Sequence, residues 1–186
     1  LGDPHKGMKF VHVAGTNGKG STCAMLASIL EAAGYRVGLN TSPYLEDFRE
    51  RIQINGQMIP EDALAALTEE VRPAAEALAD HPTEFELITA IALLYFRRER
   101  CDIVVLEVGL GGALDASNVI DPPEAAVLAA MGMDHMAVLG PTMGDIAAAK
   151  AGIIKPGGTV VSLGGCPEAD AVFRRVCREK GAFLTE

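Results

Sequence analysis

The chain has 186 residues, of which 49% are hydrophobic and 22% are charged, which is enough apolar material to bury the core of one globular domain. Its formal net charge is −9 and its basic residues are scattered, so we expect no binding to nucleic acid. The four cysteines lack CxxC spacing, which favours reduced thiols in a cytoplasmic protein over a disulfide scaffold or a structural zinc site.

The longest nearly unbroken apolar stretch, residues 87–96, is shorter than the roughly 18 to 20 residues that cross a bilayer. We therefore expect no membrane span. The first ten residues lack the basic start and the apolar run of a secretory signal, so we interpret them as an internal segment of a longer polypeptide.

The first part of the chain has the pattern of a β-α-β unit. Residues 10–14 are a short β-type run, and apolar residues recur at helical spacing from Gly18 onward. Gly34 suits the end of that helix, and residues 36–40 predict the next strand. Residues 50–56 predict a short extended piece that ends in an Asn-Gly turn.

The rest of the chain alternates helices and strands. A helix begins near Pro60, and Pro73 is expected to kink or interrupt it. The remaining elements are a helix at 85–100, strands at 101–109 and 124–133, a helix at 143–151, a strand at 159–163 and a helix at 167–180. This alternation predicts an α/β fold in which an open, mostly parallel sheet carries helices on both faces, within a single domain at 1–186.

The run HVAGTNGKGST at 12–22 is the first chemical motif. It places glycines and one lysine between a strand and a helix, where backbone N–H groups can hold phosphate oxygens and Lys19 can neutralise them. The loop departs from the Walker form, because Gly20 instead of a hydroxyl residue follows Lys19. A turn that serves only tight packing is the weaker alternative. The predicted nucleotide-binding residues are Gly15, Thr16, Asn17, Gly18, Lys19, Gly20, Ser21 and Thr22.

Five segments in order carry a resemblance to a known family. They are GTNGKGS, TSPYL with RERIQING, TEFELITAIALLYF, EVGLGGALDASN, and MDHMAVLGPTMGDIAAAKAGIIKPG. Together they cover nearly the whole chain and resemble folylpolyglutamate synthases and dihydrofolate synthases, relatives of the Mur ligases. Mur ligases usually have a hydroxyl residue after the lysine, so Gly20 favours the folate branch. The resemblance implies a P-loop NTPase-like Mur ligase central domain.

The same resemblance implies ATP and Mg²⁺ as cofactors. It assigns Ser42 and Glu107 to magnesium positions and His135 to a ligand of a second ion. It assigns Lys150 to a lysine that family members carry as a carbamate, which helps to hold magnesium. Lys19, Lys150 and His135 are the implied catalytic residues. Taken alone, Ser42 could cap a turn, His135 could be an ordinary loop residue, and Lys150 could be a surface lysine that complements a helix dipole. Glu107 has the strongest physical basis, because ligands bind at the carboxyl ends of parallel strands.

The resemblance also implies which residues contact the pteroate part of a substrate. These are Phe85, Glu86, Leu114, Asp115 and Ala116. Phe85 could equally be a core residue of its helix, and Asp115 could organise the glycine-rich turn. Tyr44, Ala113 and Ala149 stand where the family commonly has histidine, arginine and glutamate, so the preferred substrate stays open.

The implied reaction transfers the γ-phosphoryl group of ATP to a substrate carboxylate, and the amine of L-glutamate then attacks the acyl phosphate. Dihydropteroate and reduced folates are the implied acceptors, and the chemistry depends on positioning and charge neutralisation. The family's C-terminal domain is missing from this sequence, so we expect a truncated, monomeric chain that binds nucleotide weakly and is inactive alone. A Mur-type amino-acid ligase domain and a non-catalytic nucleotide-binding module are the alternatives.

Overall fold

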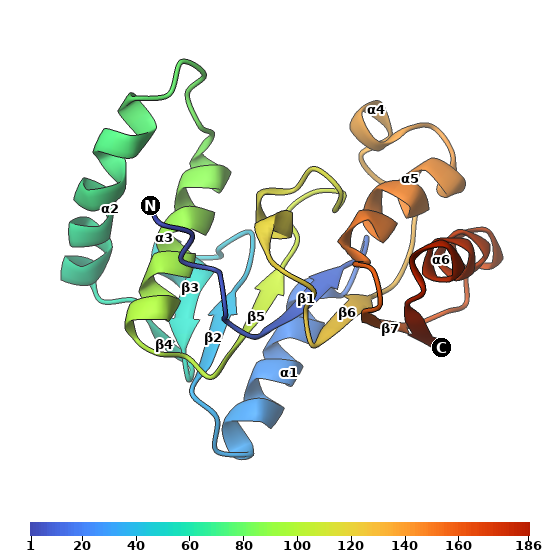
Figure 1. The fold of residues 1–186 in the computed structure, drawn as a ribbon, viewed down its shortest axis with the longest axis horizontal. Helices are drawn as coiled ribbons and strands as arrows, with labels where there is room; N and C mark the ends of the chain where they lie inside the picture. Colours follow the sequence, from blue (N-terminus) through green and yellow to red (C-terminus); the bar gives the residue numbers. More distant parts are fainter.

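The computed structural model describes residues 1–186, and its eight strands form a single sheet. The strands are β1 Phe10–Ala14, β2 Val37–Asn40, β3 Ile52–Ile54, β4 Gln57–Met58, β5 Ile103–Glu107, β6 Ala125–Leu128, β7 Thr159–Ser162 and β8 Phe183–Thr185. Their order in the sheet is β4-β3-β2-β5-β1-β6-β7-β8 (Figure 1). Only β3 runs antiparallel to its neighbours β2 and β4. The predicted open, mostly parallel sheet is confirmed.

Helices cover both faces of this sheet, as predicted (Figure 1). The α-helices are α1 Lys19–Ala32, α2 Glu61–Glu76, α3 Glu84–Arg98, α4 Met136–Leu139, α5 Met143–Lys150 and α6 Pro167–Lys180. The 3₁₀ helices are η1 Phe48–Arg51, η2 Ala116–Val119 and η3 Ala151–Ile153. One face carries α1, whereas the other carries α3, α5 and α6, with α2 beside α3 (Figure 1). None of the helices has the length and hydropathy that a membrane crossing requires.

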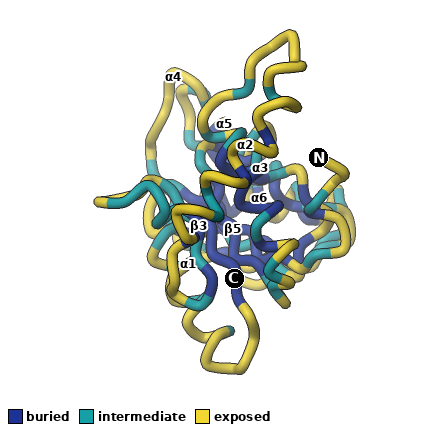
Figure 2. The backbone as a smooth tube through the Cα atoms, turned by 90° about the vertical axis from the view of Figure 1, so that its left-hand side faces the viewer, coloured by how far each residue is buried: buried dark blue, intermediate teal, exposed yellow.

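The buried centre of the molecule follows the two-residue alternation of β1. Val11 and Val13 face α1, whereas Phe10 and Ala14 contribute to the two hydrophobic clusters on the opposite face. Figure 2 shows this core as a continuous buried band through the middle of the fold. All five residues of β1 are buried, so the strand gives a rigid base to the loop that follows it.

Local signals explain where several helices begin and end. Glu86 closes a capping box at the start of α3, where its Oε2 accepts a hydrogen bond of 2.7 Å from Thr83 N, and Thr83 Oγ1 accepts one from Glu86 N. Helix α6 begins with Pro167 in its first turn and ends at Lys180, and the residue that follows, Gly181, has a φ of 61° that suits glycine. Its bounds are those predicted from the sequence.

Helix α2 contains the proline that was expected to kink or interrupt it. Pro73 does not interrupt α2, which continues to Glu76. The proline lies in the last turns on an exposed surface, so the carbonyl of Glu69 that loses its partner can bind water. The short elements α4 and β8 were not predicted, because three or four residues carry too little periodicity.

The carboxyl ends of the central strands form the edge that matters for function. The chain passes from β1 to β2 on one side and from β6 to β7 on the other, so the strand order reverses between β1 and β6. Ligands of open α/β sheets bind at such a reversal. The glycine loop, residues 15–18, leaves the sheet at this point.

Candidate nucleotide and substrate site

Backbone contacts hold the glycine loop against the end of β6. The N–H groups of Thr16 and Asn17 both donate to the carbonyl of Ala130, at 2.8 and 3.2 Å. Thr16 Oγ1 also donates to the carbonyl of Gly132 at 2.9 Å. Gly18 precedes α1 with a φ of 78°, which glycine adopts without steric cost. These hydrogen bonds within the protein define the shape of the loop.

The start of α1 is open to an anion. No side chain caps the helix, and the N–H of Thr22 makes its bond to the carbonyl of Gly18. The N–H groups of residues 19–21 thus lack the intrahelical partners that later residues have. Lys19 folds back over the loop, with Nζ 3.3 Å from the carbonyl oxygen of Thr16. This combination of free N–H groups and an amine can hold phosphate oxygens.

Glu107 and Ser42 lie beside this helix start. Glu107 is the last residue of β5 and is 3% exposed, and its Oε2 accepts a hydrogen bond of 2.9 Å from Ser42 N. A Cβ atom on Gly20 would lie 3.7 Å from the same oxygen, so the carboxylate reaches the first turn of α1. Burial raises the pKa of Glu107, while the Ser42 N–H and the charge of Lys19 act in the opposite direction. A buried carboxylate with acceptor positions to spare needs a cation nearby.

Lys150 approaches the glycine loop from α5. Its side chain is buried, with the residue 4% exposed, and Nζ donates to the carbonyl of Gly15 at 2.9 Å. The alternative of a surface lysine at a helix end is therefore wrong. Desolvation and the positive charge of Lys19 lower the pKa of Lys150 to about 8, against an opposing effect of Asp134.

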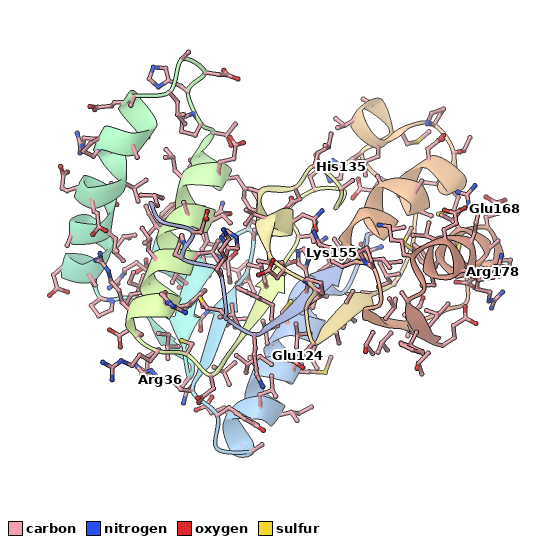
Figure 3. The ribbon with its side chains drawn as sticks, viewed as in Figure 1. Arg36, Glu124, His135, Lys155, Glu168 and Arg178 are labelled. Atoms are coloured by element: carbon pink, nitrogen blue, oxygen red, sulfur yellow. The ribbon has the colours of Figure 1, made fainter.

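No hydrogen bond connects His135 to Lys19, Glu107 or Lys150. Its side chain is exposed at the start of α4 (Figure 3), and its Nε2 lies 3.4 Å from Asp134 Oδ2. No three His, Cys, Asp or Glu side chains gather into a ready-made cation site. Mg²⁺ retains several waters and uses substrate phosphates as ligands, so the donor set of Ser42 and Glu107 still fits that ion.

A cavity of about 360 Å³ lies next to the glycine-rich turn that follows β5. It is lined by all five residues predicted to contact the pteroate group, which are Phe85, Glu86, Leu114, Asp115 and Ala116. Phe85 is half-buried, and a Cβ atom on Gly109 would come within 2.6 Å of its Cζ. Phe85 therefore packs on Gly109 and lines the cavity at the same time. Glu86 also has the structural role of capping α3.

A second cavity connects this region to Ser42 and adds a residue that the sequence analysis missed. Arg51 lines it together with Ser42, Phe85 and Asp115. The guanidinium carbon of Arg51 lies 5.3 Å from the ring centre of Tyr44, within cation–π distance. The RERIQING motif contains Arg51, but only the fold shows which of its two arginines turns toward the cavity.

A glycine loop between β1 and α1, with a lysine and a buried carboxylate at the carboxyl edge of a parallel sheet, defines the class of P-loop NTPase-like α/β domains. Within this class, the family model of the Mur ligase middle domain matches residues 13–175. The chain belongs to the Mur ligase middle domain family.

Relatives and solved structures point to the folate branch of that family. A Bacillus subtilis protein named dihydrofolate synthase/folylpolyglutamate synthase is 46% identical over 187 residues, covering 98% of this chain and 43% of the relative. A solved FPGS–AMPPCP–folate complex superposes with a TM-score of 0.94 at 44% identity, covering 98% of this chain and 46% of that one. Escherichia coli FolC, solved with DHPP and ADP, gives a TM-score of 0.89 at 42% identity, covering 97% and 42%.

Proposed function

We propose that this chain is the ATP-binding part of a ligase that adds L-glutamate to folate, to dihydropteroate or to both through an acyl phosphate. The chain spans less than half the length of the curated relatives named above, so this activity is proposed for the whole protein. The observation that carries the proposal is the convergence of Lys19, Glu107 and Lys150 on the glycine loop. Support also comes from similar structures that hold AMPPCP with folate, and ADP with DHPP.

In this proposal the protein positions the reactants and balances their charge. Residues 15–22 hold the phosphates of ATP, and Lys19 neutralises the terminal group. Ser42 and Glu107 hold Mg²⁺, which neutralises charge on the phosphates when it is bound. His135 stays in the proposal as a further metal ligand, with support from its sequence motif alone.

Lys150 is proposed to carry a carbamate. A pKa near 8 leaves a larger fraction of its amine unprotonated at neutral pH than an ordinary lysine has. The neutral Nζ can form a C–N bond to carbon dioxide with loss of one proton, which converts a buried cation into an anion. That anion would face Lys19 and relieve the repulsion between the two amines.

The acceptor is proposed to occupy the cavity beside Phe85 and Asp115. Phe85 offers an aromatic edge, and the carboxylate of Asp115 offers a hydrogen-bond acceptor to a donor group of a pteroate ring. Residues 1–186 are proposed to form one domain that works as a cytoplasmic monomer together with a further ligase domain of the kind found in the family. Amide product formed by residues 1–186 alone would contradict that requirement.

Lys19→Ala tests the proposed function in the full chain that contains these residues. ADP release that depends on dihydropteroate or folate should fall by about 100-fold or more, because a charge that stabilises the transferred group is lost. Lys9→Ala is the matched control, since Lys9 precedes the N-terminal end of β1, away from the glycine loop. It pairs only weakly with Glu124, at 3.8 Å (Figure 3 labels Glu124). A Lys19→Ala enzyme with the wild-type rate would refute the assigned role.

The acceptor class needs a separate measurement. Phosphate release should be stimulated by dihydropteroate or reduced folates together with L-glutamate, and not by a nucleotide-linked peptide. Stimulation by the nucleotide-peptide alone would replace the folate ligase with a Mur-type amino-acid ligase. Absence of turnover with every acceptor would favour a non-catalytic nucleotide-binding module.

A further inference from the structure

A buried histidine lies beneath the substrate cavity and has no part in the function proposed so far. His12 is in the middle of β1 and is 0% exposed. Its Nε2 lies 2.8 Å from the hydroxyl oxygen of Ser117, which is itself fully buried in η2. Ser117 Oγ donates in turn to Asp115 Oδ1. A continuous chain of hydrogen bonds therefore runs from the sheet to a carboxylate that lines the cavity.

The chemistry of the middle residue determines the direction of this chain. A serine hydroxyl has one hydrogen to donate, and Ser117 donates it to Asp115 Oδ1. Without a hydrogen between them, the hydroxyl oxygen and the carboxylate oxygen would repel each other. Ser117 Oγ must then accept from His12, so Nε2 of His12 carries the proton. Burial, with a smaller effect of Lys155, lowers the pKa of His12 to about 3 and keeps the ring neutral. Its Nδ1 is buried and has no hydrogen-bond partner.

This chain of hydrogen bonds from His12 through Ser117 to Asp115, called the relay below, fixes the orientation of the Asp115 carboxylate. Oδ1 accepts from both the N–H and the hydroxyl of Ser117, and Oδ2 accepts from Leu110 N at 2.9 Å. A carboxylate offers about four acceptor positions, so one position on Oδ2 remains for a ligand. Without the hydroxyl of Ser117, Oδ1 would keep a single backbone bond and the carboxylate could rotate more freely.

The relay also connects two parts of the site. His12 precedes Gly15 by three residues on β1, and β1 is paired on both sides, with Leu106 and Ala126 in register with His12. The strand that carries the glycine loop is thus tied to the turn that carries Asp115. Lys155 adds a second anchor, with Nζ donating to the carbonyl of Asn118 at 3.0 Å (Figure 3 labels Lys155).

We infer that His12 and Ser117 are positioning residues, which hold the Asp115 carboxylate in the orientation that binds the acceptor and keep it in register with the glycine loop. This inference rests on the proposed function for the identity of the acceptor. It predicts that the two residues affect acceptor binding through one shared hydrogen-bond chain. Neither residue needs to touch the acceptor or ATP.

A double-mutant cycle in the full chain tests the shared effect. Ser117→Ala should raise the KM for the dihydropteroate or folate acceptor by about tenfold and leave the KM for ATP unchanged. His12→Leu should act in the same direction, and the double variant should add little beyond Ser117→Ala. His12→Gln, which keeps an N–H donor of similar reach, should restore most of the wild-type KM. Additive effects, or equal changes in both KM values, would overturn the inference.

Ser162→Ala is the matched control, because it also deletes a buried serine hydroxyl, on β7 and outside the cavity residues. It should cost similar stability and leave the acceptor KM unchanged. An acceptor KM raised by Ser162→Ala as much as by Ser117→Ala would show that loss of any buried hydroxyl weakens acceptor binding. That result would refute the specific role of the relay.

Histidine nitrogen signals give a readout that does not need turnover. With ¹⁵N-labelled histidine in the full chain, the His12 ring should show a proton on Nε2 and none on Nδ1, and Ser117→Ala should shift that signal. A proton on Nδ1 would refute the relay whatever the substrate is. If the signals fit but no pteroate or folate acceptor reacts with the wild-type enzyme, the relay stands and the proposed function fails.

Discussion

The amine of Lys150, buried at the end of α5, donates a hydrogen bond of 2.9 Å to the carbonyl oxygen of Gly15 at the start of the glycine loop. The two residues are 135 positions apart in sequence. The bond places an amine with a lowered pKa directly beneath the loop proposed to hold ATP phosphates, so the protonation of Lys150 bears on both stability and function.

Replacing Lys150 by methionine should give a stability gain that depends on pH. In the wild type the folded-state pKa is about 8, below the unfolded value of 10.5, so the unfolded chain binds more protons between these values. The cost of burying the cation is therefore fully present below about pH 8 and is relieved as pH rises. The advantage of Lys150→Met should shrink above pH 8, by at most about 1.4 kcal/mol per pH unit.

Urea unfolding at pH 7, 8 and 9 in buffer free of carbon dioxide measures this difference. Lys9→Met, which replaces an exposed lysine, is the control and should show no pH-dependent difference from wild type. A constant gap between Lys150→Met and wild type over this range would show that the pKa of Lys150 is not lowered.

Glu107→Gln should separate charge from shape at the proposed metal site. The glutamine oxygen can still accept from Ser42 N, but the negative charge that would hold Mg²⁺ is lost. We expect the Mg²⁺ concentration needed for half-maximal ATP-analogue binding to rise about tenfold or more. The unliganded variant should be as stable as wild type or more stable, because the desolvation cost of the buried carboxylate, which outweighs the favourable effect of Lys19, is removed.

Calorimetric titration of the ATP analogue over a range of Mg²⁺ concentrations checks this outcome, together with thermal melting of the unliganded proteins. Glu124→Gln is the control, because Glu124 is an exposed carboxylate that precedes the N-terminal end of β6, away from the proposed metal site. Equal Mg²⁺ dependence in Glu107→Gln and wild type would exclude Glu107 as a ligand.

Gly109→Ala should disturb the acceptor cavity and leave the glycine loop intact. The new Cβ would come within 2.6 Å of Phe85 Cζ and 2.9 Å of Cε2, so the ring must move. Overpacking of this kind costs about 1 to 3 kcal/mol of folding free energy. The KM for the acceptor should rise, with little change in the KM for ATP.

Two further variants test the steric cause. Adding Phe85→Leu to Gly109→Ala should restore the free energy of unfolding, because the smaller side chain leaves room for the new methyl group. Gly144 lies inside α5, where a new Cβ atom would be 3.7 Å from Thr142 Oγ1, an ordinary van der Waals contact. Gly144→Ala should therefore be neutral or slightly stabilising in urea unfolding. An acceptor KM unaffected by Gly109→Ala would show that the position of the Phe85 ring is unimportant for binding.

Most of the secondary structure could be predicted because its signals are local. The run 10–14, the glycine loop after it and the helical spacing beyond it identified β1 and α1 within a residue or two. Pro73 shows the limit of such rules, because the effect of a proline depends on whether its partner carbonyl can reach water. That depends on which surface of α2 the tertiary packing leaves exposed.

The sequence by itself determined the class of the fold and the position of the glycine loop, since both arise from patterns within a few residues of one another. Only the tertiary structure decided that Lys150 is buried against Gly15 and that His12 meets Ser117, 105 positions away. Contacts over such distances depend on strand order and on the burial of whole elements. Hydrophobic packing of the entire chain sets both, and no local spacing encodes them.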